Sequence, residues 1–375
     1  MLHGIKTNVL TTGTRAIAAL ASGVIGIVVT ADDADAAAFP LDTPVLVTDL
    51  RAALARAGTT GTMLAALTAI YDQASPILVI VRVAEDAEDQ DAPVIGAPGT
   101  YTGLHALLAA ESVCGVRPRV LGAPGLDTQA VTTALVTVAG KLRAMVYAAA
   151  VGADIAAAVL YRADFAAREL MLIWPNWSGA FAGDAVARAL GLRARIDEET
   201  GWHKSLSNVA VNGVTGISES LFFDIQDETT DVAALNDAEI TALVRSPAGG
   251  FVYWGNHTCS DEPLFAFEPA VRTSQILQDE IARGLVWASD KPLTKFLIKD
   301  LLETINARIR SLVVQQRLIG GRAWFDPALN DEADLAAGKL VIDYEFTPAA
   351  PLEGLTLNQR ITDKYYADLA AELAA

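Results

Sequence analysis

The first two hundred positions alternate between short apolar runs and stretches whose apolar residues recur at helical spacing. Continuous runs of β-branched and aliphatic residues predict strands that are covered on both faces. Apolar residues at i, i+3 and i+4 predict amphipathic helices. We expect strands at 24–29, 77–83, 119–122, 144–150 and 170–174. We expect helices at 49–57, 62–73, 104–110, 128–142 and 180–190, the last ending at Gly191, while 155–161 fits either type.

Strands that alternate with helices indicate a largely parallel sheet covered on both faces. An acidic stretch with Pro and Gly at 85–99 interrupts this alternation and predicts a surface excursion or a boundary. The predicted fold class is therefore α/β for this part of the chain, and α+β overall.

The pattern changes after Gly201, where alanine becomes scarcer and aromatic residues gather. We expect a strand at 251–254, long amphipathic helices at 272–287 and 293–318, and a half-buried strand at 340–346. Pro348 and Pro351 end that strand, and an extended piece at 355–361 leads into a C-terminal helix. At the other end, residues 1–15 are polar, with Ile5 and Val9 on one side of a possible extended segment that has no partner strand nearby.

The predicted helix at 293–318 carries a basic stripe. Asp290 can cap it, Pro292 suits its first turn, and Gly320-Gly321 end it. At ~100° per residue, the basic positions fall within an arc of about 100°; they are Lys291, Lys295, Lys299, Arg310 and Arg317. From Asp290 to Arg322 there are seven basic and three acidic residues, in a chain of net charge −17. The stripe is either a solvated face or a contact surface for an acidic partner.

Length and charge limit the classes of function. A chain of 375 residues can bury a core without disulfides or metals. Its charge of −17 disfavours general binding to nucleic acid. The two cysteines, Cys114 and Cys259, are expected to be reduced core residues. The apolar run at 16–31 resembles a secretory signal, but its alternation with small residues favours a buried strand.

Motifs of catalysis are mostly missing from the sequence. It contains no Gly-rich dinucleotide or phosphate loop, no His-Glu-x-x-His, no Cys-x-x-Cys and no Gly-x-Ser-x-Gly. None of the four histidines lies at ligand spacing from another candidate, so we predict no metal and no cofactor. A dispersed triad of His105, Asp127 and Ser178 can be written down, as can many others, so an α/β hydrolase stays open as the alternative.

Seven segments in colinear order together resemble one family. They are 169–175, 201–208, 211–217, 254–261, 287–292, 338–344 and 355–365. In these segments the chain resembles the tail sheath proteins of contractile bacteriophages, and is similar to the short sheath of R-type pyocins. Before residue 169 only the general layout matches.

The resemblance implies a structural protein rather than an enzyme, whose copies polymerise as stacked six-membered rings around a tail tube and contract to drive it through a cell envelope. It implies an N-terminal arm at 1–20, a small α/β outer region at 21–100, a subtilisin-like α/β domain without a working triad at 101–250, an inner tube-facing domain at 251–350 and a C-terminal arm at 351–375. The arms would add strands to neighbouring copies, through Ile5, Val9, Leu355, Leu357 and Ile361, and the basic stripe would face the tube.

The implied partners are other copies, the tube, the baseplate and the tail terminator, with no nucleic acid and no insertion into a membrane. The implied location is the virion, after assembly in the bacterial cytoplasm. A pyocin-like particle needs the same subunit, so it stays open as a second alternative.

Overall fold

The computed structural model describes residues 17–178, 185–366 and 372–373, and its centre is an eight-stranded sheet. The strand order is β10-β9-β6-β5-β4-β1-β3-β2. The six strands from β3 to β9 in that order run parallel, while the edge strands β2 and β10 are antiparallel to their neighbours. The strands are β1 (Ile25–Thr30), β2 (Val45–Val47), β3 (Leu78–Val83), β4 (Val120–Gly122), β5 (Met145–Ala149), β6 (Leu170–Trp174), β9 (Ile240–Arg245) and β10 (Phe251–Trp254).

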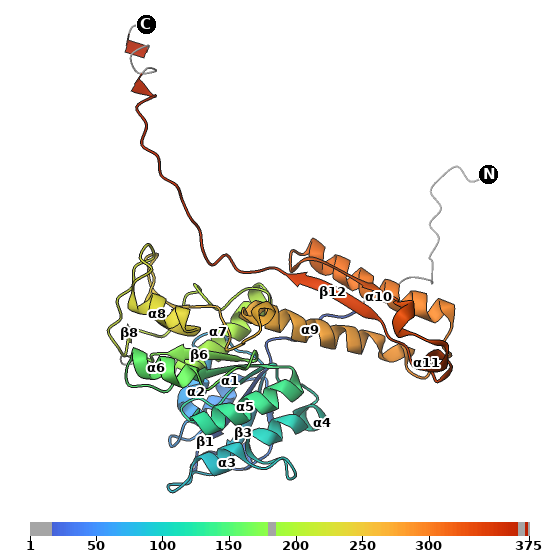
Figure 1. Ribbon diagram of the computed structural model, residues 1–375. Helices are drawn as coiled ribbons and strands as arrows, with labels where there is room; N and C mark the ends of the chain where they lie inside the picture. Colours follow the sequence, from blue (N-terminus) through green and yellow to red (C-terminus); the bar gives the residue numbers. More distant parts are fainter. Residues whose placement is uncertain (1–16, 179–184, 367–371, 374–375) are drawn as a thin grey trace, which may run out of the picture.

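Helices cover both faces of this sheet, as the alternating pattern predicted (Figure 1). Ile25, Ile27 and Val29 of β1 pack on one side with α1 (Leu50–Leu54), α2 (Met63–Tyr71) and α7 (Ala185–Glu199). Val28 packs on the other side. That side is covered by α3 (Asp91–Ile95), η1 (Gly103–Ala109), α4 (Ala110–Cys114), α5 (Gln129–Leu142), α6 (Ile155–Arg162) and α8 (Asp231–Asp237).

The run at 16–31 contains β1, the strand between β4 and β3, with all six residues buried. The prediction of a buried strand there is confirmed. No helix in the described part of the chain is long and apolar enough to span a bilayer.

The helix predicted at 180–190 does not stop at Gly191. Instead α7 continues to Glu199. A Cβ on Gly191 would lie 2.8 Å from the carbonyl oxygen of Ile70, so the glycine lets α7 lie close against α2. Its role is close packing between helices, and not helix termination.

A smaller C-terminal region lies beside the sheet (Figure 1). It contains η3 (Val286–Ala288), α10 (Lys295–Val314), β11 (Leu318–Trp324), η4 (Pro327–Leu329), α11 (Glu332–Ala336) and β12 (Asp343–Pro348), and α9 (Glu268–Leu285) connects it to the sheet. β11 and β12 form an antiparallel pair that packs on α10, around a core of Ile305, Ile309 and Leu312. Outside these two regions lie the short pair β7 (Trp177–Ser178) and β8 (Gly216–Ile217), and η2 (Pro263–Phe265).

The expected helix at 293–318 is wrong at both ends. Its N-cap is Thr294, whose hydroxyl accepts the N–H of Leu297, whereas Asp290 lies four residues earlier with φ +62°. The helix ends at Val314, and Gly320-Gly321 lie inside β11. A Cβ on Gly321 would lie 2.6 Å from the carbonyl oxygen of Glu345, so this glycine permits close strand pairing.

The expected division of the chain differs from the structure in two places. Strands from 21–100 and from 101–250 belong to one sheet, because β1 pairs with both β3 and β4. β10, at the start of the expected inner domain 251–350, is the edge strand of that same sheet.

Candidate functional site

The carboxyl ends of β4, β5 and β6 border a cleft of about 420 Å³, the usual place for a ligand in an open α/β sheet. Its lining includes Asp127 but neither His105 nor Ser178. Asp127 accepts the N–H of Ala149, and Ser178 donates its hydroxyl hydrogen to the carbonyl of Ile217 at 3.1 Å. His105 lies buried in η1, where burial and Lys141 lower its pKa. The structure therefore does not assemble the triad that the sequence allowed.

No group of three or more metal-binding side chains occurs among the residues that the structure describes. Cys259 is a buried, free thiol, and burial raises its pKa to about 12. A cluster of buried charged side chains lies elsewhere, where α9 meets the sheet.

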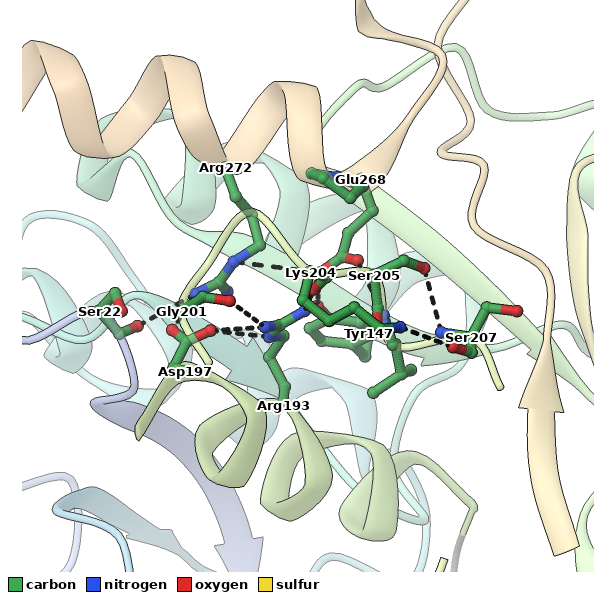
Figure 2. A network of polar contacts seen from close by, with 12 residues as sticks. Ser22, Tyr147, Arg193, Asp197, Gly201, Lys204, Ser205, Ser207, Glu268 and Arg272 are labelled. Atoms are coloured by element: carbon green, nitrogen blue, oxygen red, sulfur yellow. Dashed lines mark hydrogen bonds and ion pairs between the residues drawn. The ribbon is translucent and has the colours of Figure 1, made fainter. Parts of the chain in front are cut away.

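A buried network of charges fastens α9 to the sheet (Figure 2). It consists of Arg193 and Asp197 from α7 and Glu268 and Arg272 from α9, whose side chains are each at most 2% exposed. Arg193 contacts Asp197 at 2.7 Å and Glu268 at 3.0 Å, and Arg272 also pairs with Asp197. Two positive and two negative groups make this set neutral, which is how charges can be tolerated away from water.

Tyr147 connects this network to the centre of the sheet. Its hydroxyl donates to Glu268 at 2.6 Å, and burial followed by the Glu268 charge raises its pKa well above the ordinary value. Burial alone would lower the pKa of Arg193, but Asp197 and Glu268 raise it above its ordinary value. Arg193 therefore stays charged at any physiological pH.

Further ion pairs extend along α9. Asp279 pairs with Arg119 and Arg143, which lie just before the central strands β4 and β5. One residue later, Glu280 pairs with Arg308 of α10 at 2.7 Å, on the side of the C-terminal region. α9 is thus joined by charge pairs to both regions.

Sequence reasoning missed the network, although one signal was present. Arg193 and Asp197 are four residues apart in one helix, and Glu268 and Arg272 are four residues apart in another. Opposite charges at this spacing usually lie on a solvated face. Here they are buried because the two helices meet, 75 residues apart in sequence.

The β11–β12 pair is open at both sides, since among the described strands each has only the other as a neighbour. Unpaired N–H and C=O groups on a strand edge are a template for another strand. Ile319, on β11, is 69% exposed. Both outer edges of the pair therefore lack a neighbouring strand among the described residues.

The chain beyond β12 leaves the body as an extended arm (Figure 1). From Leu352 to Tyr366 every residue is exposed. Of the predicted arm residues, Leu355, Leu357 and Ile361 lie here with exposed fractions of 71%, 80% and 96%. They form no strand within this chain, and Ile5 and Val9 lie outside the described residues.

One side-chain contact joins the start of the arm to the rest of the subunit. Glu353 contacts the imidazole of His257 at 2.9 Å, and His257 packs edge-on against Phe267, just before α9. The arm therefore leaves the body beside α9, the helix that also carries the buried network.

The structure divides the predicted basic stripe. Only Lys295, Lys299 and Arg310 lie on α10, because the helix is shorter than expected. Lys291 precedes the helix and lies over the ring of Trp287 at 4.3 Å. Arg317 follows it and stacks on Trp202 at 4.4 Å, so it is part of the packing between the C-terminal region and the body.

Three domains of one family match the chain in succession. The "Tail sheath protein Gp18 domain III N-terminal region" matches residues 22–83. The "Phage tail sheath protein central domain" matches residues 99–259, and the "Phage tail sheath C-terminal domain" matches residues 260–362.

Two curated relatives match along nearly their whole length. The chain is 48% identical to the tail sheath protein of Escherichia phage P2, over 99% of this chain and 98% of the relative. It is 36% identical to a putative prophage major tail sheath protein of Pseudomonas aeruginosa (strain UCBPP-PA14), over 98% of each.

Solved structures share the fold at low sequence identity. The helical sheath of the anti-feeding prophage in its contracted state has a TM-score of 0.72 and 17% identity, covering 97% of this chain and 99% of that one. The PVC sheath of an extracellular contractile injection system, also contracted, has a TM-score of 0.73 and 16% identity, covering 97% and 98%.

Proposed function

Because this chain belongs to the phage tail sheath family, and is therefore a structural subunit of a contractile sheath, we propose that its arms join it to neighbouring copies and that its C-terminal region faces the tail tube. As a tail sheath protein it is a component of the virion that assembles with other copies of itself. The fold with α and β layers and the resemblance found in the sequence are both confirmed.

The exposed C-terminal arm carries the proposal. Four large apolar residues, Leu352, Leu355, Leu357 and Ile361, are solvent-exposed in an extended segment, which is unfavourable for an isolated subunit. The open sides of the β11–β12 pair offer matching partners. Strand addition would give main-chain hydrogen bonds and bury these side chains together. Ile5 and Val9 are proposed to act in the same way from the N-terminal arm, residues 1–20.

The tube contact is proposed for the exposed basic residues on and next to α10. Lys291 and Arg310 are both exposed, and Arg310 has only an exposed pairing with Glu303. Lys295 and Lys299 are exposed as well, whereas the stacking of Arg317 on Trp202 removes it from this surface. An acidic tube would attract such a surface in spite of the negative charge of the whole chain.

Other parts of the assembly follow from this role. We propose that residues 21–250 and β10 form the outer part, with the rest of 251–350 nearer the tube. The baseplate and the tail terminator are proposed as partners at the two ends of the sheath, and the bacterial cytoplasm as the place of assembly. The subunit is proposed to catalyse no reaction, and its cleft lacks an assembled triad.

Deletion of residues 352–375 tests the arm proposal. The truncated subunit should keep the circular dichroism spectrum and melting temperature of the full chain, because the described residues of the arm are exposed. It should no longer form sheath tubes in sedimentation or electron microscopy, because each missing strand removes several hydrogen bonds of ~1 kcal/mol. Deletion of 1–15 is the parallel test for the other arm. Tubes of normal length from both truncated proteins would contradict the proposal.

A further inference from the structure

A groove of about 830 Å³ runs between α10 and α11 in the C-terminal region. Its lining is mainly apolar, and the large side chains are Leu293, Ile298, Leu302, Phe325 and Leu335. Its charged lining residues are Lys295 and Lys299, one helical turn apart on α10, and Glu332 of α11, so the groove carries one positive charge in excess. Within the described ranges neither lysine has an acidic partner. The groove therefore suits a segment that is apolar on one face and acidic beside it.

The chain's own C-terminal end, which we call the tip (residues 365–375), has this chemistry. Tyr366, Leu369 and Leu373 are three and four residues apart, the spacing of one helix face. Asp368 and Glu372 are four apart, the same spacing as the two lysines. Tyr366 and residues 372–373 are helical, and the side chains of Tyr366 and Leu373 are exposed.

We propose that the tip of one copy docks as a helix in the groove of a second copy, with Asp368 and Glu372 against Lys295 and Lys299. This inference rests on the proposed strand addition by the arm, and extends it to a second, side-chain-specific contact. The apolar face of the tip supplies the buried anchor, and the charge pairs set its register. This inference takes Lys295 and Lys299 out of the tube contact proposed above, which then rests on Lys291 and Arg310.

The occupant is a second copy because of where the arm goes. Figure 1 shows the arm leaving the end of β12 and running away from α10 and α11 of its own chain. The thirteen residues from Glu353 to Tyr365 can span about 43 Å when extended. Phe325 follows directly after β11 and lines the groove. An arm strand that runs parallel to β11 of a neighbour therefore ends beside that neighbour's groove.

A charge swap tests the pairing without identifying any other partner. The variants are K295E/K299E, D368K/E372K and the chain that carries all four changes. Each double variant should raise the concentration needed for sheath assembly in the absence of tube by about tenfold, because two attractions become two repulsions. The fourfold variant should return to within about twofold of the unchanged chain. Melting curves of the unassembled subunits check that each variant folds.

Two further variants separate this inference from the proposed function. Deletion of 365–375 removes the tip but keeps the arm strand, and it should impair assembly as the double variants do. Leu335→Ser should impair assembly by removing an apolar contact of the groove, whereas Leu264→Ser, at an exposed leucine outside the groove, should not.

Three outcomes would overturn the inference. One is a fourfold variant as defective as the doubles, and another is normal assembly after deletion of 365–375. The third is a K295E/K299E protein that assembles normally alone but fails on tubes, which would assign both lysines to the tube. In each case, loss of assembly on deleting 352–375 would leave the proposed strand addition standing.

Discussion

Cys259 shows how a single buried residue makes stability depend on pH. Burial raises the pKa of its thiol from 9.0 to about 12, so the folded protein keeps a proton that the unfolded chain loses. The stabilising effect is complete below about pH 9 and is lost as the pH rises toward about 12.

Replacing this thiol should therefore reduce the alkaline loss of stability. Between about pH 8 and about pH 10, the free energy of unfolding should fall in both proteins. The fall should be smaller in Cys259→Ala than in the unchanged subunit, by about 1.4 kcal/mol. Urea unfolding at several pH values measures this difference. Other alkaline groups are shared by both proteins, so their effects cancel, and parallel pH curves would contradict the expected role of Cys259.

Glu268 is the residue on which the buried network depends most. Glu268→Gln would leave Asp197 as the one acidic partner of Arg193 and Arg272 among the described residues. It should lower the free energy of unfolding by about 3–5 kcal/mol. Glu345→Gln is the matched control, since Glu345 pairs with Arg322 on the surface and should change stability little. Urea unfolding of the unassembled subunits compares the two. Equal, small effects would show that the network is not a structural clamp.

Sequence reasoning succeeded at residues whose neighbours along the chain decide their environment, and failed where distant contacts decide it. Ile25, Ile27 and Val29 of β1 were predicted to be buried because they alternate with smaller residues along a run without charges. Arg317 was assigned to a solvated or partner-facing stripe, but it stacks on Trp202, which is more than a hundred residues earlier. No local pattern contains that information.

At the scale of elements, the start of α10 can be tested directly. Thr294→Ala should lower the free energy of unfolding by about 1 kcal/mol, because it removes the side chain that accepts the N–H of Leu297. Asp290→Gly should cost nothing or stabilise slightly, because Asp290 has a positive φ of 62° that glycine adopts without strain. Thermal melting distinguishes the two variants. The opposite order would restore Asp290 as the cap.

The elements themselves followed from periodicity in most of the chain. Five of the six parallel strands were predicted, among them β1, β3 and β6, whose buried runs of five to six residues are distinctive. The sixth, β9, was not predicted. Glycine caused two further errors, because Gly191 and Gly320-Gly321 predicted helix ends. Gly191 instead permits close packing with α2, and Gly321 permits close pairing with β12, whereas Gly320 has open space around it. The strand β11 was missed for the same reason, because two glycines are unusual inside a strand.

At the scale of the whole molecule, the ion pairs that join both regions to α9 bear on contraction. We expect a subunit joined in this way to move as one unit and to store little energy internally, so the energy is expected in the lattice between subunits. About 100 Å² of extra apolar burial per subunit in the contracted lattice is worth ~2.5 kcal/mol, and the sum over a sheath is large.

Sheath expressed without tube should therefore assemble directly in the contracted lattice, and ATP with magnesium should make no difference. Electron cryomicroscopy of such assemblies, with and without nucleotide, measures this. Tubes that settle in the extended lattice, or that shorten only when nucleotide is added, would contradict this account of the stored energy.

The exposed arm also has a consequence for the unassembled pool of subunits. Extended, solvent-accessible chain is what proteases cut most readily, and Arg360 and Lys364 lie within it. An arm that pairs with a neighbour would be shielded, so degradation would remove surplus subunits and spare those already in a tail. We expect host proteolysis to keep the supply of sheath matched to the number of tails under construction.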